Sequence, residues 1–272
     1  DTQQRANMYL LPFIGNKPID EISSPIMRVL LLNIQDKGIS DTVHKIKGIA
    51  TRVFQYSVGM GVIDINPVRD LSSDLFNKKS KKHFAAVTDP KEIAWVLNSL
   101  KQHKGSDVVK SALDLIPHIF VRPYELAGLP WSEIDFDNRI IRIVNKRMKM
   151  KKPHLVPMSK QVFEMLLNLN KIDRGSSFVF PSPRNRNRHI SPNSLLVAMR
   201  TVGIEKDKHC THGWRTTAST RLHEEGFNRD VIESQLAHET PGVRGVYSQA
   251  EYLADRKKMM QFWSDYLNSL VT

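Results

Sequence analysis

Apolar residues recur every three or four positions along most of the chain, a spacing that predicts amphipathic helices. In SPIMRVLLLNIQDKG, Ser24 is expected to cap a helix that has Pro25 in its first turn and ends at Gly38. A second helix is expected to begin with Ser40 as its cap and to run to the glycine-rich end at Gly61. The first part of the chain is therefore predicted to be a small helical bundle.

The run NKKSKKH at residues 77–83 interrupts this pattern. It is charged and nearly free of apolar residues, and it separates two regions of apolar periodicity. We therefore predict a linker at about 77–84 between a helical domain at 1–80 and a second domain at 85–272. A solvated loop inside one domain is the alternative interpretation.

The second region is predicted to combine helices with short strands. TDP at residues 88–90 predicts a helix start with Thr88 or Asp89 as the cap and Pro90 in the first turn. Residues 131–145 and 154–159 are short β-branched and apolar segments that suit a small antiparallel sheet, to which FVF at 178–180 could add an edge. From Pro192 onward the helical spacing returns. The predicted fold class is mainly α with a small antiparallel β-sheet.

Charge narrows the choice of partner. Lysine and arginine number 40 against 28 acidic residues, a formal net charge of +12. This excess favours a polyanion, with nucleic acid as the leading candidate, because binding to phosphates releases condensed counterions. A basic protein without such a partner is the alternative, since net charge does not determine fold or function.

The number of cysteines and the first residues of the chain indicate the cellular compartment of the protein. A single cysteine, Cys210, excludes an internal disulfide and fits the cytoplasm. No apolar run approaches the roughly 18 to 20 residues that cross a bilayer, so no membrane partner is expected. The polar start DTQQRAN is not a signal peptide and lacks methionine, so we expect a fragment of a longer protein.

Two pairs of ionisable residues are spaced for one helical face. VRPYE places Arg122 and Glu125 three residues apart, and THGWR does the same for His212 and Arg215. The arginine fork can hold two phosphoryl oxygens, and histidine can exchange protons near neutral pH. A surface salt bridge and an incidental histidine are the alternatives. Zinc at the HCTH motif, residues 209–212, is disfavoured because a second ligand pair is lacking.

A tyrosine follows these pairs across a glycine-containing segment. In QLAHETPGVRGVY, Tyr247 lies nine residues after His238. A tyrosine can attack phosphorus once neighbouring cations stabilise the developing charge. A buried tyrosine on an amphipathic helix is the alternative.

The turn NKRMKMKKPH between two strand candidates is strongly basic. Most of its cations are expected to meet phosphates, and one lysine could protonate a leaving 5′-oxygen. Spacing alone leaves the choice open. The candidate lysines are Lys146, Lys149, Lys151 and Lys152, and Arg147 is expected only to contact DNA.

In this order, RPYEL, the lysine turn, HGWR, LAH and the later tyrosine resemble the catalytic domain of the tyrosine recombinase (phage integrase) family. WSEIDFDNR and RMKMKKPHLVPMS are especially similar to integrases of prophages and genomic islands. The resemblance runs from about Thr88 onward and implies an α+β tyrosine-recombinase catalytic domain. Residues 22–70 resemble the family's helical core-binding domain, and the N-terminal domain for arm-type sites is expected to be absent.

The resemblance also implies a role for each candidate. Arg122 and Arg215 clamp the scissile phosphate, with Glu125 either orienting Arg122 or shaping the cleft. The remaining catalytic roles fall to Lys149 as general acid, His212 and His238 in proton transfer and phosphate binding, and Tyr247 as nucleophile. Tyr252 competes with Tyr247, which is favoured by its distance from His238. Further contacts to DNA are expected from the linker and from a loop at 184–189, through Lys78, Lys79, Lys81, Lys82, Arg184, Arg186 and Arg188.

The implied activity is site-specific recombination that integrates or excises a mobile element. DNA is cleaved through a 3′-phosphotyrosyl bond with a free 5′-hydroxyl, and strands exchange through a four-way junction without a metal or nucleotide cofactor. The implied partners are the double-stranded DNA of an attachment-site core, a homotetramer on that DNA, a DNA-bending accessory protein and an excisionase. The implied location is the bacterial cytoplasm, on the nucleoid.

Two other functions would use parts of this pattern. A non-catalytic DNA-binding regulator needs only basic charge and helices, and it would tolerate Tyr247→Phe. A type IB topoisomerase-like enzyme would share the chemistry without exchanging strands. The C-terminal helix, residues 250–270, is expected either to pack on its own domain or to dock on a neighbouring protomer.

Overall fold

The computed structural model describes residues 2–77, 84–147, 153–172, 175–238 and 252–271. The chain forms two compact units, Asp1–His83 and Phe84–Thr272, hereafter unit 1 and unit 2. In the part of the chain that is described, no helix is both long and apolar enough to cross a membrane.

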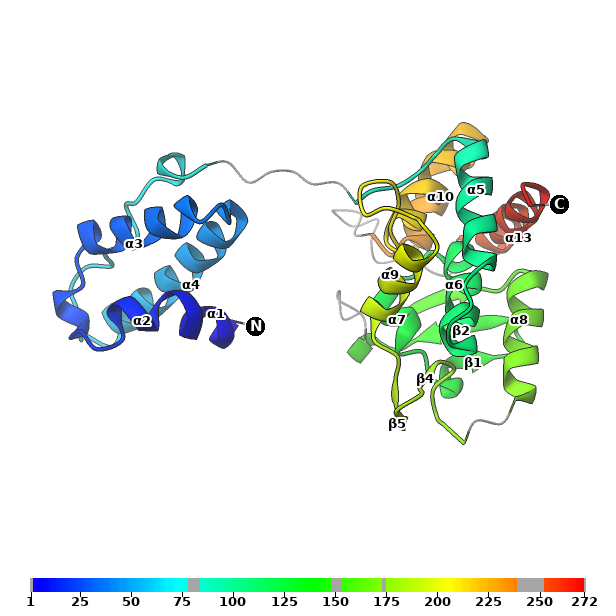
Figure 1. Cartoon of the computed structure of the whole chain (residues 1–272), viewed down its shortest axis with the longest axis horizontal. Helices are drawn as coiled ribbons and strands as arrows, with labels where there is room; N and C mark the ends of the chain where they lie inside the picture. The colour runs from blue at the N-terminus through cyan, green and yellow to red at the C-terminus, as the bar shows by residue number, and fades with distance from the viewer. Residues whose placement is uncertain (1, 78–83, 148–152, 173–174, 239–251, 272) are drawn as a thin grey trace. The chain divides into compact units, whose positions relative to one another are not determined.

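Unit 1 is helical. Its longest helices, α3 and α4, pack against each other (Figure 1). Met27, Leu31 and Ile46 on these helices are fully buried in the apolar core of the unit. In chain order its described helices are α1 (Thr2–Tyr9), α2 (Leu11–Ile14), the 3-10 turn η1 (Ile19–Glu21), α3 (Ser24–Asp36), α4 (Ser40–Gly59) and the 3-10 turn η2 (Ser73–Leu75).

The predicted caps of the two long helices are wrong by one residue. Ser24 and Ser40 are the first helical residues of α3 and α4, and Ser23 and Ile39 precede them. Pro25 fits the second position of α3, because the backbone N–H that proline lacks has no intrahelical partner in the first turn.

Unit 2 is built around helix α6 (Asp107–Ile119), which contacts α5, α7, α8, α9, α10 and α13. The predicted cap of α5 is confirmed, since the Asp89 carboxylate accepts from the backbone N–H of Lys91 at 2.9 Å and of Glu92 at 3.2 Å. The other described helices of unit 2 are α5 (Pro90–Lys101), α7 (Pro123–Ala127), α8 (Lys160–Lys171), α9 (Pro192–Thr201), α10 (Gly213–Glu224), α11 (Arg229–Gln235) and α13 (Leu253–Ser269).

The predicted antiparallel sheet is confirmed, with strand order β1-β2-β3. Its strands are β1 (Ile134–Asp135), β2 (Ile140–Ile143) and β3 (His154–Pro157), with the 3-10 turns η3 (Trp131–Glu133) and η4 (Asn145–Arg147) at the ends of β1 and β2. Ile141 pairs with Val156, and both are buried.

Two expectations for this region are wrong. The run 184–189, predicted to be a loop, contributes strand β5 (Asn185–His189), which pairs with β4 (Pro181–Ser182) in a hairpin. Residues 178–180 do not add an edge to the three-stranded sheet, because Phe178 forms only an isolated bridge with Pro130. Both hairpin and bridge depend on pairing with segments that local sequence does not specify.

The C-terminal helix α13 packs within unit 2. Met259, Met260, Trp263 and Leu267 are buried in the core of that unit, and the Trp263 indole N–H donates to the Pro117 carbonyl at 2.8 Å. The apolar face found in the sequence is thus covered by the same unit.

Candidate active site

Arg122 and Glu125 form a buried ion pair at the start of α7. The chain turns there because Phe120, which ends α6, has a left-handed backbone with φ 58°. Arg122 Nη1 donates to Glu125 Oε1 at 2.9 Å, and its backbone N–H donates to Oε2 at 2.9 Å. Glu125 is buried, so this carboxylate fixes the Arg122 guanidinium from within the protein while part of the arginine reaches the surface.

Arg215 lies in the first turn of α10, with 5% of its surface exposed. Its guanidinium is held by two backbone carbonyls: Nη1 donates to Phe120 O and Nη2 donates to Leu236 O at 2.6 Å. Burial, followed by the charge of Arg122, lowers the pKa of Arg215 to about 10, so it stays a cation at neutral pH.

The glycine of THGWR is required by close packing. A Cβ added at Gly213 would lie 2.2 Å from the backbone oxygen of Ala85. Only glycine therefore lets the start of α10 approach the first residues of unit 2.

His238 follows α11 and touches Arg215. Its Nε2 lies 3.1 Å from Arg215 Nη2, and its Nδ1 lies 2.8 Å from Glu233 Oε2. Because an arginine can only donate, Nε2 is the acceptor and Nδ1 carries the proton that Glu233 accepts. His238 is 47% exposed, so it connects the buried arginine to the surface.

The histidines of the THGWR region have different surroundings. His212 immediately precedes α10, and its ring packs against Phe84 with centroids 4.0 Å apart. His209 is fully buried, accepts from the Val87 backbone N–H at 3.2 Å, and has its pKa lowered to about 4 by burial. Within the described ranges, no group of three or more histidine, cysteine or acidic side chains could hold a metal.

Arg147 was expected to contact DNA from the hairpin between β2 and β3. Instead its guanidinium points inward, forming an ion pair with the buried Glu133 and donating to the Glu125 carbonyl at 2.5 Å. Only 20% of its side chain is exposed. Arg147 therefore ties the base of the hairpin to α7, whereas the neighbouring Lys146 is exposed.

Several predicted residues lie outside the described ones. Tyr252, the alternative to Tyr247, is described and packs partly buried against the core of unit 2. The predicted residues outside the described ranges are Tyr247, Lys149, Lys151 and Lys152, and in the linker Lys78, Lys79, Lys81 and Lys82.

The sequence analysis missed two side chains at the centre of this arrangement, His154 and Gln235. His154 is buried at the start of β3, and its Nε2 donates to the Gln235 carbonyl at 3.1 Å. Burial, followed by the charge of Arg256, lowers the pKa of His154 to about 3, so it is neutral. A histidine on the core side of an apolar strand is the signal that could have revealed it.

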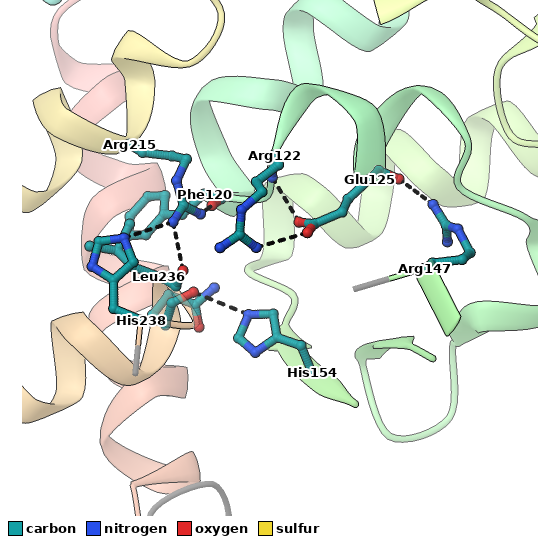
Figure 2. A network of polar contacts seen from close by, with 9 residues as sticks. Phe120, Arg122, Glu125, Arg147, His154, Arg215, Leu236 and His238 are labelled. Atoms are coloured by element: carbon teal, nitrogen blue, oxygen red, sulfur yellow. Dashed lines mark hydrogen bonds and ion pairs between the residues drawn. The ribbon is translucent and has the colours of Figure 1, made fainter. Parts of the chain in front are cut away.

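Figure 2 shows Arg122, Arg215, His154 and His238 approaching one another from α7, α10, β3 and the end of α11. Two cations held by buried acceptors, with an imidazole at hydrogen-bond distance from one of them, form a site suited to a phosphate group.

Comparisons with known proteins point to one family. The model of the Phage integrase family matches residues 86–253, and that of the Phage integrase central domain matches residues 1–74. The integrase of Shigella phage Sf6 is 34% identical over 96% of this chain and 68% of its own length. The prophage integrase IntS of Escherichia coli gives the same three values.

Solved structures share the fold. A lambda integrase dimer bound to a COC′ core site has a TM-score of 0.69 at 17% identity, covering 88% of this chain and 86% of that one. The Tn1549 transposon integrase in complex with circular intermediate DNA has a TM-score of 0.66 at 18% identity, covering 88% and 85%.

Proposed function

The chain belongs to the phage integrase family and is a site-specific tyrosine recombinase, and we propose that Arg122, Arg215 and His238 bind the scissile phosphate of DNA for attack by Tyr247. The observation that carries this assignment is the contact between His238 and the buried Arg215, beside the Arg122–Glu125 pair.

The proposed cleavage step is a transesterification. The Tyr247 oxygen forms a bond to phosphorus, the bond from phosphorus to the 5′-oxygen breaks, and Lys149 gives a proton to the departing 5′-oxygen. His212 and His238 assist in moving the tyrosine proton and in binding phosphate. The product is a 3′-phosphotyrosyl bond with a free 5′-hydroxyl, and attack by another 5′-hydroxyl reverses the step to join strands.

Preorganised cations support the step without a metal. The two backbone carbonyls that hold Arg215 and the carboxylate that holds Arg122 fix both guanidiniums before DNA binds. Such donors need no reorganisation as charge develops on the phosphate oxygens, and each is typically worth about 10² to 10³ in rate. Glu125 is the positioning residue for Arg122.

The DNA partner is proposed to be the core of an attachment site, which unit 1 would bind as a core-type DNA-binding domain and unit 2 would bind as the catalytic domain. A solved lambda integrase tetramer is bound to a Holliday junction, which supports a homotetramer on DNA here. A DNA-bending protein, an excisionase and a nucleoid location complete the proposal. Backbone phosphate contacts are proposed for exposed Lys146, Arg184, Arg186 and Arg188 and for the lysines of the linker and hairpin.

Covalent trapping tests the class of activity. The full chain is incubated with nicked duplexes taken from the ends of its mobile element, so that the departing strand diffuses away. We expect a slower-migrating, protease-sensitive protein–DNA band with the wild type. Tight DNA binding with no covalent band on any duplex of the set would identify a non-catalytic DNA-binding protein instead.

A further inference from the structure

Arg256 on α13 is fully buried and bonds to no carboxylate among the described residues. Its Nε and Nη2 both donate to Gln235 Oε1, at 2.9 Å and 2.8 Å. Nη2 also donates to the backbone carbonyl of Leu155. Burial lowers the pKa of Arg256 to about 10, which leaves it charged at neutral pH.

Helix packing alone does not account for this residue. A buried guanidinium is unfavourable unless its hydrogen bonds are satisfied, and a methionine or leucine would fill similar space without that cost. Here Arg256 Nη1 and His154 Nδ1 are both buried without a hydrogen-bond partner in the described part of the chain. The contacts that Arg256 makes indicate its structural role.

Gln235 is the centre of these contacts. Its side-chain oxygen accepts from Arg256, its Nε2 donates to Ile119 O at 3.3 Å, and its backbone carbonyl accepts from His154 Nε2 at 3.1 Å. One residue therefore joins α13, the end of α6 and β3.

The same three elements lead directly to the candidate catalytic groups. Ile119 directly precedes Phe120, and Gln235 directly precedes Leu236. The backbone carbonyls of Phe120 and Leu236 are the two acceptors that hold the Arg215 guanidinium. Leu155 follows His154 on β3, the strand that brings His154 to the candidate site. A shift of Gln235 would move the Leu236 carbonyl that holds Arg215 relative to β3.

We propose that Arg256 is a positioning residue for strand cleavage: by holding the Gln235 side chain and the Leu155 carbonyl with one planar group, it fixes the carbonyl contacts of Arg215 relative to strand β3. This inference rests on the proposed function. It predicts a defect in the rate of the chemical step, with DNA affinity retained.

The test compares four variants of the full chain: Arg256→Met, Arg256→Lys, Lys257→Met and Trp263→Phe. Lys257 is exposed on the same helix, so Lys257→Met is the matched control for loss of one charge. Trp263→Phe removes a hydrogen bond that docks α13 and leaves the Gln235 contacts in place, which controls for loss of stability. The readouts are the single-turnover rate of adduct formation at saturating nicked DNA, the Kd for that DNA, and the Tm.

We expect Arg256→Met to slow adduct formation roughly 10- to 100-fold, because small misplacements of reacting groups cost rates of this size, with little change in Kd. Arg256→Lys should recover part of the rate, since an ammonium keeps the charge and replaces only some of the fork's hydrogen bonds. Lys257→Met should cleave at the wild-type rate, and Trp263→Phe should lower the Tm more than the rate.

The inference would be overturned if Arg256→Met and Trp263→Phe lowered the Tm equally and also slowed adduct formation equally. It would also be overturned if Arg256→Met weakened DNA binding as much as it slowed adduct formation. If Arg256→Met fails to fold, Arg256→Lys decides: a wild-type rate would overturn the inference, and a slower rate at unchanged Kd and Tm would support it. A wild type that forms no adduct would contradict the proposed function itself.

Discussion

The two units differ in what they bury. In the described part of unit 1, the buried polar side chains are neutral, Ser57 and Asn66. The buried ionisable side chains of the described chain all lie in unit 2: His118, Glu125, Glu133, His154, His209, Arg215 and Arg256. A charge removed from water is costly unless it is paired, so its presence requires a reason beyond packing.

This difference indicates that the buried side chains of unit 1 serve packing, whereas some of those of unit 2 also serve the proposed site. Unit 1 is held together by apolar contacts between helices such as α3 and α4. Unit 2 has a larger apolar core, and its buried charged groups lie behind the proposed phosphate site. Substitution of the buried ionisable residues of unit 2 should therefore slow cleavage strongly. Substitution of exposed basic residues outside the proposed site should mainly weaken DNA binding.

The largest effect is expected from the proposed general acid. Lys149→Ala should slow cleavage by about 10² to 10⁴, the range of general acid–base catalysis. A duplex with a 5′-bridging sulfur at the scissile bond should restore most of the rate, because a thiolate leaves without a proton. Cleavage of both duplexes is compared in single-turnover assays, with Lys146→Ala as the matched hairpin control. A defect that the sulfur duplex leaves intact would contradict the assignment.

Arg215→Lys should be the next most damaging change, slowing cleavage by about 10² to 10³. A lysine keeps the charge but cannot bind two carbonyls and a phosphate with one planar group. The matched control is Arg52→Lys on the exposed surface of unit 1. Equal rates for the two variants at saturating DNA would show that burial of Arg215 has no catalytic consequence.

Acid should destabilise unit 2 through its buried histidines. Burial lowers the pKa of His118 to about 4, of His154 to about 3 and of His209 to about 4. The unfolded state then binds more protons than the folded state between pH 6.5 and 4, so the free energy of unfolding falls as the pH falls through this window. Each histidine contributes a slope of about 1.4 kcal/mol per pH unit.

Tryptophan fluorescence measures this in the full chain, because all four tryptophans lie in unit 2. Urea unfolding is followed at several pH values between 7 and 4. His118→Gln should reduce the slope by one histidine's share, and His44→Gln in unit 1 should leave it unchanged. An identical slope in wild type and His118→Gln would refute the linkage.

The smallest effect is expected from the linker. Neutralising Lys79 and Lys81 together should weaken DNA binding and reduce the slope of log affinity against log salt by about 2, one for each lost phosphate contact. Cleavage at saturating DNA should stay at the wild-type rate. A salt titration of binding by fluorescence anisotropy checks this, and an unchanged slope would exclude the contacts.

Local signals in the sequence predicted local features of the structure. Asp89 and Pro90 predicted the start of α5, and the spacing in RPYE and THGWR predicted which side chains share a helix start. The position of Ser24 was misjudged because proline fits either of the first two helical positions, and the sequence does not distinguish them.

The rest of the site depends on distant partners. Arg256 bonds to a carbonyl 101 residues away, and His154 to one 81 residues away. Arg147 points inward because Glu133, fourteen residues earlier, is buried beside it. Most of these acceptors are backbone carbonyls, which every residue carries, so no residue type in the sequence indicates them.

In the proposed mechanism, Tyr247 attacks the phosphate that Arg122 and Arg215 bind. The most direct test is to digest the trapped protein–DNA adduct and identify the modified peptide by mass spectrometry, with Tyr247→Phe and Tyr252→Phe run in parallel. We predict a phosphotyrosyl bond on Tyr247 that disappears in Tyr247→Phe and persists in Tyr252→Phe. An adduct on Tyr252, or one that survives Tyr247→Phe, would contradict the account.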